Sequence, residues 1–215
     1  MSNELLCTIL ILAGFISGSV MYSALMPKLF CHKDIRKISD DHNAGAYNVF
    51  KYCGVPLGIV CLLCDMLKGF IPVLLGVLFC DIHSLLFTFV IIAPTLGHAL
   101  GVFSKFQGGK CISTIFGEMI ALVWISPELF ILATLYVIFC IVPGIHSDRI
   151  RSIITFSCFL VIALVVEAHM GRVFVGLGCS ACALISILCH LRVKDAQIVS
   201  AKMEAKEEET AQLHK

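Results

Sequence analysis

Long apolar runs dominate this sequence and leave few folds open to it. A helix of about 20 apolar residues crosses a bilayer, and backbone inside lipid must satisfy its own hydrogen bonds. With 59% hydrophobic and 14% charged residues among 215, the chain is predicted to be an all-α, polytopic membrane protein of about seven transmembrane helices. The runs lie at roughly 4–26, 53–80, 84–103, 111–125, 128–145, 152–170 and 173–190.

Some of these helices are expected to be short or broken. The run at 111–125 is short, and Ser126-Pro127 separates it from the next run as a tight turn. The run at 53–80 is interrupted by Asp65 and by Lys68-Gly69. We therefore expect a break in this second run.

The first run is expected to be retained as a membrane span. Glu4 is the only charge before it, so it lacks the basic segment of a signal peptide. Its small residues favour close helix packing over cleavage: Gly18, Ser19 and Ala24. Residues 1–193 are thus predicted to form an integral membrane domain, and residues 194–215 a polar cytoplasmic tail.

Basic residues predict the orientation, because cytoplasmic loops carry an excess of Lys and Arg. With seven spans, the opposite-side loops hold a single basic residue, Arg172. The amino terminus is therefore expected outside a bacterial cell membrane, and the basic loops in the cytoplasm. The net charge of +1 argues against a nucleic-acid partner. The basic loop residues that share the side of the tail are Lys28, Lys33, Arg36, Lys37, Lys51, Lys105, Lys110, Arg149 and Arg151.

The twelve cysteines carry little functional signal. Most lie inside apolar runs, where cysteine behaves as a small hydrophobe. Cys61-x-x-Cys64 and Cys179-x-x-Cys182 have the spacing of metal ligands, but both lie within apolar helices without nearby ligand partners. No metal and no cofactor are expected.

A glycine-rich basic loop, Gly108-Gly109-Lys110, is the strongest chemical signal. Paired glycines let backbone approach a ligand and point N–H groups at it, and a lysine supplies a compact charge for phosphate. The loop is not a P-loop, because Ser104 stands where the first glycine belongs and Cys111 follows the lysine. His98, one turn inside the membrane, is either a base or hydrogen-bond partner or a buried packing residue.

The connection 27–52 carries a second polar cluster. Arg36 suits the oxygens of a phosphate, and Asn43 and Asn48 suit hydroxyl groups. A surface loop whose lysines only set the topology is the alternative.

Asp65 and Lys68 form a third feature, three residues apart on one helical face. Ionisable residues in an apolar run are costly unless they are paired or face a cavity. Either Lys68 helps to bind phosphate, or the two residues form an ion pair that braces a helix break at Gly69 and Pro72. The structural role is slightly favoured.

Together these segments resemble the PlsY-type glycerol-3-phosphate acyltransferases of bacteria. That family carries motifs of the form DIR-x-x-GSGNPGATN, D-x-x-KG-x-x-PV and GH-x-F-x-x-F-x-x-F-x-GGK. The matching residues are Asp34, Ile35, Arg36, Asn43, Gly45, Ala46, Asn48 and Gly54 for the first motif, Asp65, Lys68, Gly69, Pro72 and Val73 for the second, and Gly97, His98, Phe103, Phe106, Gly108, Gly109, Lys110, Thr114 and Gly117 for the third.

The resemblance implies a seven-helix membrane enzyme whose active site faces the cytoplasm. Its members transfer a fatty acyl group from acyl phosphate to glycerol 3-phosphate, which gives lysophosphatidic acid for phospholipid biosynthesis. The implied catalytic residues are Lys110, His98, Asp41 and Asn43. The implied substrate- and phosphate-binding residues are Arg36, Asn48, Gly108, Gly109, Lys110 and Lys68.

The first motif departs from the family pattern. Under the alignment Asp41 replaces the motif serine, and one extra residue between Arg36 and Asn43 leaves room for Ser39 to lie nearby. A carboxylate beside a phosphate site is repulsive unless it is protonated, paired with Arg36 or acting as a base on the acceptor hydroxyl. The closing motif is also reduced, to the residues 190–194. Two alternatives stay open: a divergent relative that acts on another polar acceptor, and a non-catalytic small-molecule transporter.

Overall fold

The computed structural model describes residues 2–143, 145 and 147–192 of the chain, and the predicted polar tail 194–215 lies outside these residues. The described part is helical, with no strand. Its helices are α1 Asn3–Ser19, α2 Tyr22–Phe30, α3 Ile35–Ile38, α4 Ala46–Cys53, α5 Val55–Phe79, α6 Leu85–Leu100, the 3-10 turn η1 Val102–Ser104, α7 Ile112–Leu122, α8 Glu128–Ile141, α9 Asp148–His169 and a last helix, Val173–Arg192.

The all-α, polytopic membrane fold is confirmed. Within the described residues, four helices are long and apolar enough to cross a bilayer, and the bent pair α1–α2 supplies a fifth if it counts as one span. The apolar helices α7 and α8 are shorter than the length of about 17–25 residues that a crossing requires. Short segments are therefore present as expected, and a count of seven spans stays a prediction.

The break in the bundle lies in the first apolar segment and not in the second. Helix α1 ends at Ser19, Val20 is extended, and α2 begins at Tyr22 with a bend of 42° between the two axes. Helix α5 continues without interruption past Gly69 and Pro72. The expected break in the second run is therefore wrong, because a proline costs a membrane helix only local hydrogen bonds that its surroundings can replace.

Helices α1 and α6 pack closely along a seam of small residues, as the first run predicted. A Cβ atom on Gly18 would lie 2.1 Å from the Pro94 carbonyl oxygen, and one on Gly97 would lie 2.2 Å from the Phe15 carbonyl oxygen. Only glycine allows two helix backbones to approach so closely. This contact fixes the start of the chain against the helix that carries His98.

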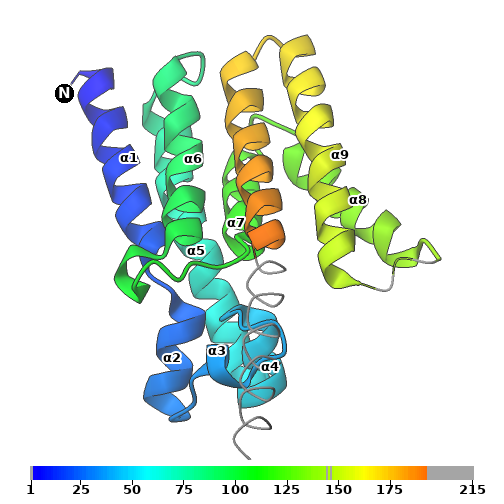
Figure 1. Ribbon diagram of the computed structural model, residues 1–215. Helices are drawn as coiled ribbons and strands as arrows, with labels where there is room; N and C mark the ends of the chain where they lie inside the picture. The colour runs from blue at the N-terminus through cyan, green and yellow to red at the C-terminus, as the bar shows by residue number, and fades with distance from the viewer. Residues whose placement is uncertain (1, 144, 146, 193–215) are drawn as a thin grey trace, which may run out of the picture.

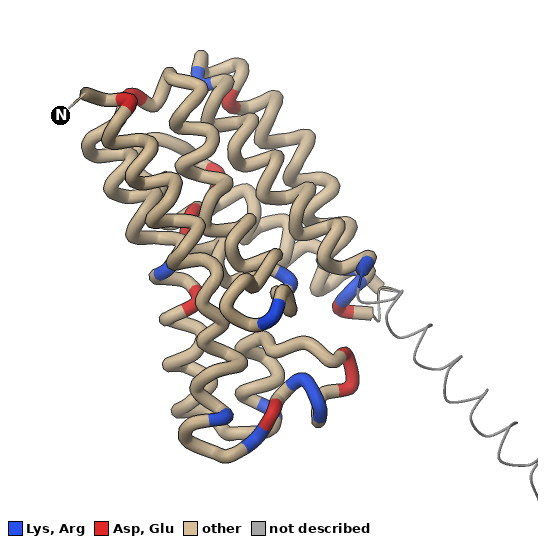
Figure 2. Tube along the Cα trace, turned by 60° about the vertical axis from the view of Figure 1, so that its left-hand side comes forward, with Lys and Arg blue, Asp and Glu red and all other residues tan. Residues whose placement is uncertain are grey.

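The two ends of the bundle differ in their loops. Figure 1 shows α2, α3 and α4 at its lower end, below α1, α6, α9 and the last helix, while α5 extends into both regions. We call this the loop end. Lysine and arginine gather mainly in this lower half in Figure 2, together with several acidic residues. Charged side chains from distant parts of the sequence thus come together there.

Candidate active site

The segment between α2 and α4 presents a compact polar turn. Asp34 caps α3 by accepting a hydrogen bond from the Arg36 N–H at 3.3 Å, and the chain turns through His42, whose φ is +50°. Gly45 then precedes α4, and Asn48 lies buried in the first turn of that helix. The turn brings Asp41, which precedes it, within reach of Asn48.

Three donors surround the Asp41 carboxylate. The Lys110 Nζ lies 2.6 Å from Oδ2, the Asn48 Nδ2 lies 2.8 Å from Oδ1, and the Asn43 backbone N–H donates to Oδ1 at 3.3 Å. The Asn48 amide also donates to the Asn43 carbonyl oxygen at 2.7 Å. Asp41 is thus paired with Lys110 and not with Arg36.

Asp41 is ionised at neutral pH in this setting. Burial raises the pKa of its carboxyl group, but the hydrogen bond and charge of Lys110, with the donors of Asn48 and Asn43, outweigh burial and lower the pKa below its ordinary value. The contact with Lys110 is therefore a charge-assisted hydrogen bond.

Ser39 lies beside the same turn. Its hydroxyl donates to the Asn43 carbonyl oxygen at 3.4 Å, and its side chain is buried. The sequence alignment placed Ser39 near the position of the missing motif serine, and the structure brings it next to Asn43.

The glycine-rich loop runs back along α6. Gly101 ends that helix in the left-handed region, at φ +57°, and the chain returns so that the Gly109 N–H donates to the His98 carbonyl oxygen at 3.1 Å. A Cβ atom on Gly108 would lie 2.0 Å from the Ala99 carbonyl oxygen. These glycines therefore serve close packing on α6, and the Gly109 N–H is already occupied.

His98 is buried beneath this loop. Its Nδ1 lies 3.0 Å from the Thr114 hydroxyl of α7, and its Nε2 faces Gly109, where an added Cβ atom would lie 2.3 Å away. A hydrogen-bonded, tightly covered ring has one orientation. His98 is thus both a packed residue and a member of the site.

Arg36 joins the two loops. Its guanidinium donates to the Gln107 carbonyl oxygen, and its own carbonyl oxygen lies 3.0 Å from the His42 Nδ1. The last helix also contacts the glycine-rich loop, because the Ser186 hydroxyl donates to the Lys110 carbonyl oxygen at 2.9 Å. Sequence reasoning missed Ser186; its spacing of four residues from His190, on an inward helix face, was the available signal.

Two adjoining cavities open at this place. One, of about 880 Å³, is lined by Arg36, Gly108 and Gly109 among others. The other, of about 720 Å³, is lined by Asn48, His98 and Lys110 among others, and reaches Tyr136 and Arg149. Asp41 and Asn43 line both cavities. Eight of the nine predicted site residues therefore gather around one pair of cavities.

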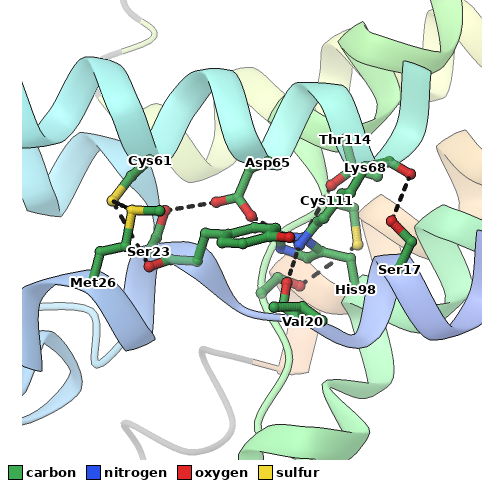
Figure 3. Close-up of polar contacts among 12 residues, drawn as sticks. Ser17, Val20, Ser23, Met26, Cys61, Asp65, Lys68, His98, Cys111 and Thr114 are labelled. Atoms are coloured by element: carbon green, nitrogen blue, oxygen red, sulfur yellow. Dashed lines mark hydrogen bonds and ion pairs between the residues drawn. The ribbon is translucent and has the colours of Figure 1, made fainter. Parts of the chain in front are cut away.

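Lys68 is the predicted site residue that reaches the cavities only through a partner, because it pairs with Asp65 and Asp65 lines the second cavity. Its ammonium lies 2.8 Å from Asp65 Oδ1 and donates to the Val20 carbonyl oxygen at 2.7 Å, and its side chain is 1% exposed (Figure 3). The Ser23 hydroxyl completes the cluster by donating to Asp65 Oδ2 at 2.6 Å. Within the described part of the chain, Lys68 lines neither cavity. The pair braces the bend between α1 and α2.

The cysteines and acidic residues form no obvious metal centre. All twelve cysteines are free, and among the described residues no group of three or more His, Cys, Asp or Glu side chains is arranged to hold a metal ion.

Comparisons with known proteins agree on one family. The sequence model described as glycerol-3-phosphate acyltransferase matches residues 8–197. Glycerol-3-phosphate acyltransferase 2 of Thermotoga maritima is 36% identical over 125 residues, which cover 58% of this chain and 63% of that protein. The glycerol-3-phosphate acyltransferase of Enterococcus faecalis is 36% identical over 133 residues, which cover 62% and 59%. The chain thus spans about three fifths of these curated relatives.

Two crystal structures share the fold. Both are of PlsY (YgiH), an integral membrane glycerol 3-phosphate acyltransferase. The glycerol 3-phosphate form has a TM-score of 0.75 at 26% identity, and the lysophosphatidic acid form has a TM-score of 0.70 at 27% identity. Each alignment covers 90% of this chain and 92% of the other. Because the family match spans most of the sequence, including every segment that meets at the two cavities, this chain belongs to the glycerol-3-phosphate acyltransferase family.

Proposed function

We propose that this protein transfers a fatty acyl group from an acyl phosphate to glycerol 3-phosphate and so makes lysophosphatidic acid, an early step of phospholipid biosynthesis. The observation that carries the proposal is the meeting of Arg36, Asn43 and Lys110 at two adjoining cavities in a chain of this family. Two cations suit two phosphate-bearing substrates, and two cavities offer room for both.

The reaction needs positioning more than a covalent intermediate. A hydroxyl oxygen of glycerol 3-phosphate attacks the acyl carbonyl carbon, the bond from that carbon to the phosphate oxygen breaks, and phosphate leaves with the electron pair. The hydroxyl proton passes to the departing phosphate oxygen, so that the donor's phosphate group leaves as hydrogen phosphate and the step balances without a base from the protein. Holding both substrates in line therefore supplies much of the acceleration.

Each residue has a role in this scheme. Lys110 and Arg36 bind phosphate oxygens and offset the negative charge, and Asn43 orients a hydroxyl. Asn48 positions the turn, because its amide already holds Asp41 and Asn43. His98, held by Thr114 and covered by Gly109, fixes the loop that presents Lys110.

The orientation of the chain fits the same scheme. The concentration of lysine and arginine at the loop end (Figure 2) favours a cytoplasmic position for that end. In a bacterial cell membrane the acyl chain then lies in the bilayer while both phosphates remain in the basic loops. Residues 1–193 would form this membrane enzyme, with 194–215 as its cytoplasmic tail.

The test is a two-substrate assay on purified protein in detergent. With palmitoyl phosphate and radiolabelled glycerol 3-phosphate, we expect release of phosphate and formation of lysophosphatidic acid. Lys110→Ala should lower the rate at least about 100-fold, because it removes a charge aimed at a transferring group.

Lys33→Ala is the matched control. Lys33 belongs to the same side of the molecule, is exposed, and donates to the Tyr52 carbonyl oxygen at 2.7 Å. Its loss should leave the rate near that of the unmodified protein. Folded protein without turnover on these two substrates would refute the proposed activity.

A related acyltransferase with a different polar acceptor is the second candidate. The occupation of Lys110 by Asp41 favours it, because an internal carboxylate disfavours an anionic acceptor at that lysine. Competition among glycerol 3-phosphate, glycerol and other polyols, with one acyl phosphate as donor, separates the two. Exclusive use of glycerol 3-phosphate would eliminate this candidate.

A further inference from the structure

Two lysine–aspartate pairs of this protein have similar geometry and opposite exposure. Asp65 and Lys68 are 2.8 Å apart with side chains 2% and 1% exposed, whereas Asp41 and Lys110 are 2.6 Å apart with side chains 29% and 19% exposed. Dissolved ions cannot reach a buried pair, but they compete for a pair that touches solvent. The first pair is therefore shielded from dissolved ions, and the second is accessible to them.

The accessible pair occupies a set of donors that suits an external anion. The Lys110 ammonium, the Asn48 amide and the Asn43 backbone N–H all donate to one carboxylate. Such a combination of ammonium, amide and backbone N–H groups is what proteins use to hold phosphate oxygens. The carboxylate itself carries a single negative charge, whereas a phosphate ester carries about −1.5 to −2 at neutral pH. The phosphate is thus the stronger ligand for the same donors.

The pair also lies between the two cavities, since Asp41 lines both of them while Lys110 lines the second. A carboxylate that leaves Lys110 still faces the first cavity, which Arg36 and Lys28 also line. Lys28 is paired there with Asp34 at 3.1 Å, and the Arg36 guanidinium donates to the Gln107 carbonyl oxygen. The displaced carboxylate would thus remain at a cavity whose lining includes two cationic residues.

We propose that Asp41 is an internal anion that occupies Lys110 in the free protein and is displaced by the phosphate group of a substrate. Asp41 then sets the affinity and selectivity for the phosphate-bearing substrate and is not the base of the reaction. The inference rests on the proposed function at one point, the binding of a substrate phosphate by Lys110.

The first test measures binding of inorganic phosphate by isothermal titration, which does not depend on turnover. Removing the competing carboxylate in Asp41→Asn should tighten binding by about 5-fold, the upper range for a solvent-accessible ion pair. Asp41→Glu restores the carboxylate and should bind as weakly as the unmodified protein. Asp40→Asn is the matched control for a general effect of charge, because it removes the same charge from the adjacent residue, which also lines the second cavity and pairs with exposed Lys51.

Kinetics separate an internal anion from a base. Asp41→Asn should lower the KM for glycerol 3-phosphate by a similar factor with little change in kcat. A large fall in kcat at unchanged KM would mean that Asp41 is a base and would overturn the proposal, as would unchanged phosphate affinity in Asp41→Asn.

The second test uses the unmodified protein and is independent of how the variants fold. A carbodiimide activates a carboxylate, a neighbouring amine attacks it, and an amide forms as the urea leaves. At 2.6 Å, Asp41 and Lys110 should give such a cross-link, detected as a joined peptide by mass spectrometry. A saturating concentration of inorganic phosphate should suppress the cross-link, and the same concentration of glycerol should not.

A cross-link that phosphate does not suppress overturns the inference. A cross-link that phosphate suppresses, in protein that transfers no acyl group, refutes the proposed function and leaves the inference standing. The two failures are therefore distinguishable.

Discussion

At the scale of single residues, the close fit of Gly109 against His98 decides where the loop of Lys110 lies. The Gly109 N–H binds the His98 carbonyl oxygen, while the imidazole occupies the space where a Cβ atom would project. Because Lys110 directly follows Gly109, the position of its ammonium depends on this contact. The glycine is required by packing at the site and not only by ligand access.

We expect Gly109→Ala to destabilise the protein by about 1–3 kcal/mol, the usual cost of overpacking. The added methyl group would lie 2.3 Å from His98 Nε2, so the ring has to move. Thermal unfolding in detergent measures the effect.

The background of the substitution provides the control. In His98→Ala protein the obstructing ring is gone, and Gly109→Ala should then cost at most about half as much, because the two sites are in contact. Equal costs in both backgrounds would show that the methyl group meets something other than His98.

At the scale of secondary structure, one buried ion pair holds the bend between α1 and α2. Lys68 on α5 donates to the carbonyl oxygen of Val20, the first residue after α1. The Ser23 hydroxyl on α2 donates to the Asp65 carboxylate (Figure 3). A broken helix leaves backbone groups without partners, and in lipid these must be satisfied by protein. The charged residues of the second run thus serve the break in the first.

Removing one partner should cost far more than removing both. Asp65→Ala leaves the Lys68 charge buried and uncompensated, a loss of about 3–5 kcal/mol in stability. Asp65→Leu combined with Lys68→Met should recover part of that loss, since no charge remains buried. Unfolding midpoints in detergent give both values.

The exposed pair of Asp40 and Lys51 is the comparison, at an N–O distance of 2.7 Å. Lys51→Met should leave the melting temperature nearly unchanged because water replaces the lost partner. If Asp65→Ala proved as mild as Lys51→Met, the bracing role of the buried pair would be untenable.

At the scale of the whole molecule, the basic residues gather at the same end as the short helices α2, α3 and α4 (Figure 1, Figure 2). The loop end carries α2, α3 and α4 (Figure 1), and most of the basic loop residues lie in this part of the molecule (Figure 2). The opposite loops hold Asp81 and His83, and Arg172 pairs there with Glu167 at 2.7 Å. The excess of positive charge is thus one-sided.

We expect reporter fusions to place the loop end in the cytoplasm. Green fluorescent protein joined after Lys215 should fluoresce in a bacterial host, and alkaline phosphatase inserted at Gly171 should be active outside the membrane. Fluorescence and phosphatase activity of whole cells are the measurements. The reverse pattern at both sites would overturn the orientation.

The local sequence predicted much of this protein. Hydropathy depends on neighbouring residues, so the apolar runs located these helices well. The expected run at 84–103 contains α6, which ends at Leu100, and the run at 53–80 begins two residues before α5. The glycine-rich loop, Arg36 and Asn43 were found in the same way, because a motif is local too.

Only the tertiary structure decided how the charges are used. Asp41 and Lys110 are 69 residues apart, and Lys68 and Val20 are 48 apart. The partner of a charged side chain depends on which distant segments meet. From the sequence alone, Asp41 could be protonated, paired with Arg36 or a base for the acceptor hydroxyl. The sequence by itself determined a membrane fold and predicted residues for phosphate binding. Packing decided that Lys68 is buried with Asp65 at a bend and that Lys110 pairs with Asp41 where solvent can reach, because only the meeting of distant segments sets the partner and the burial of a charge.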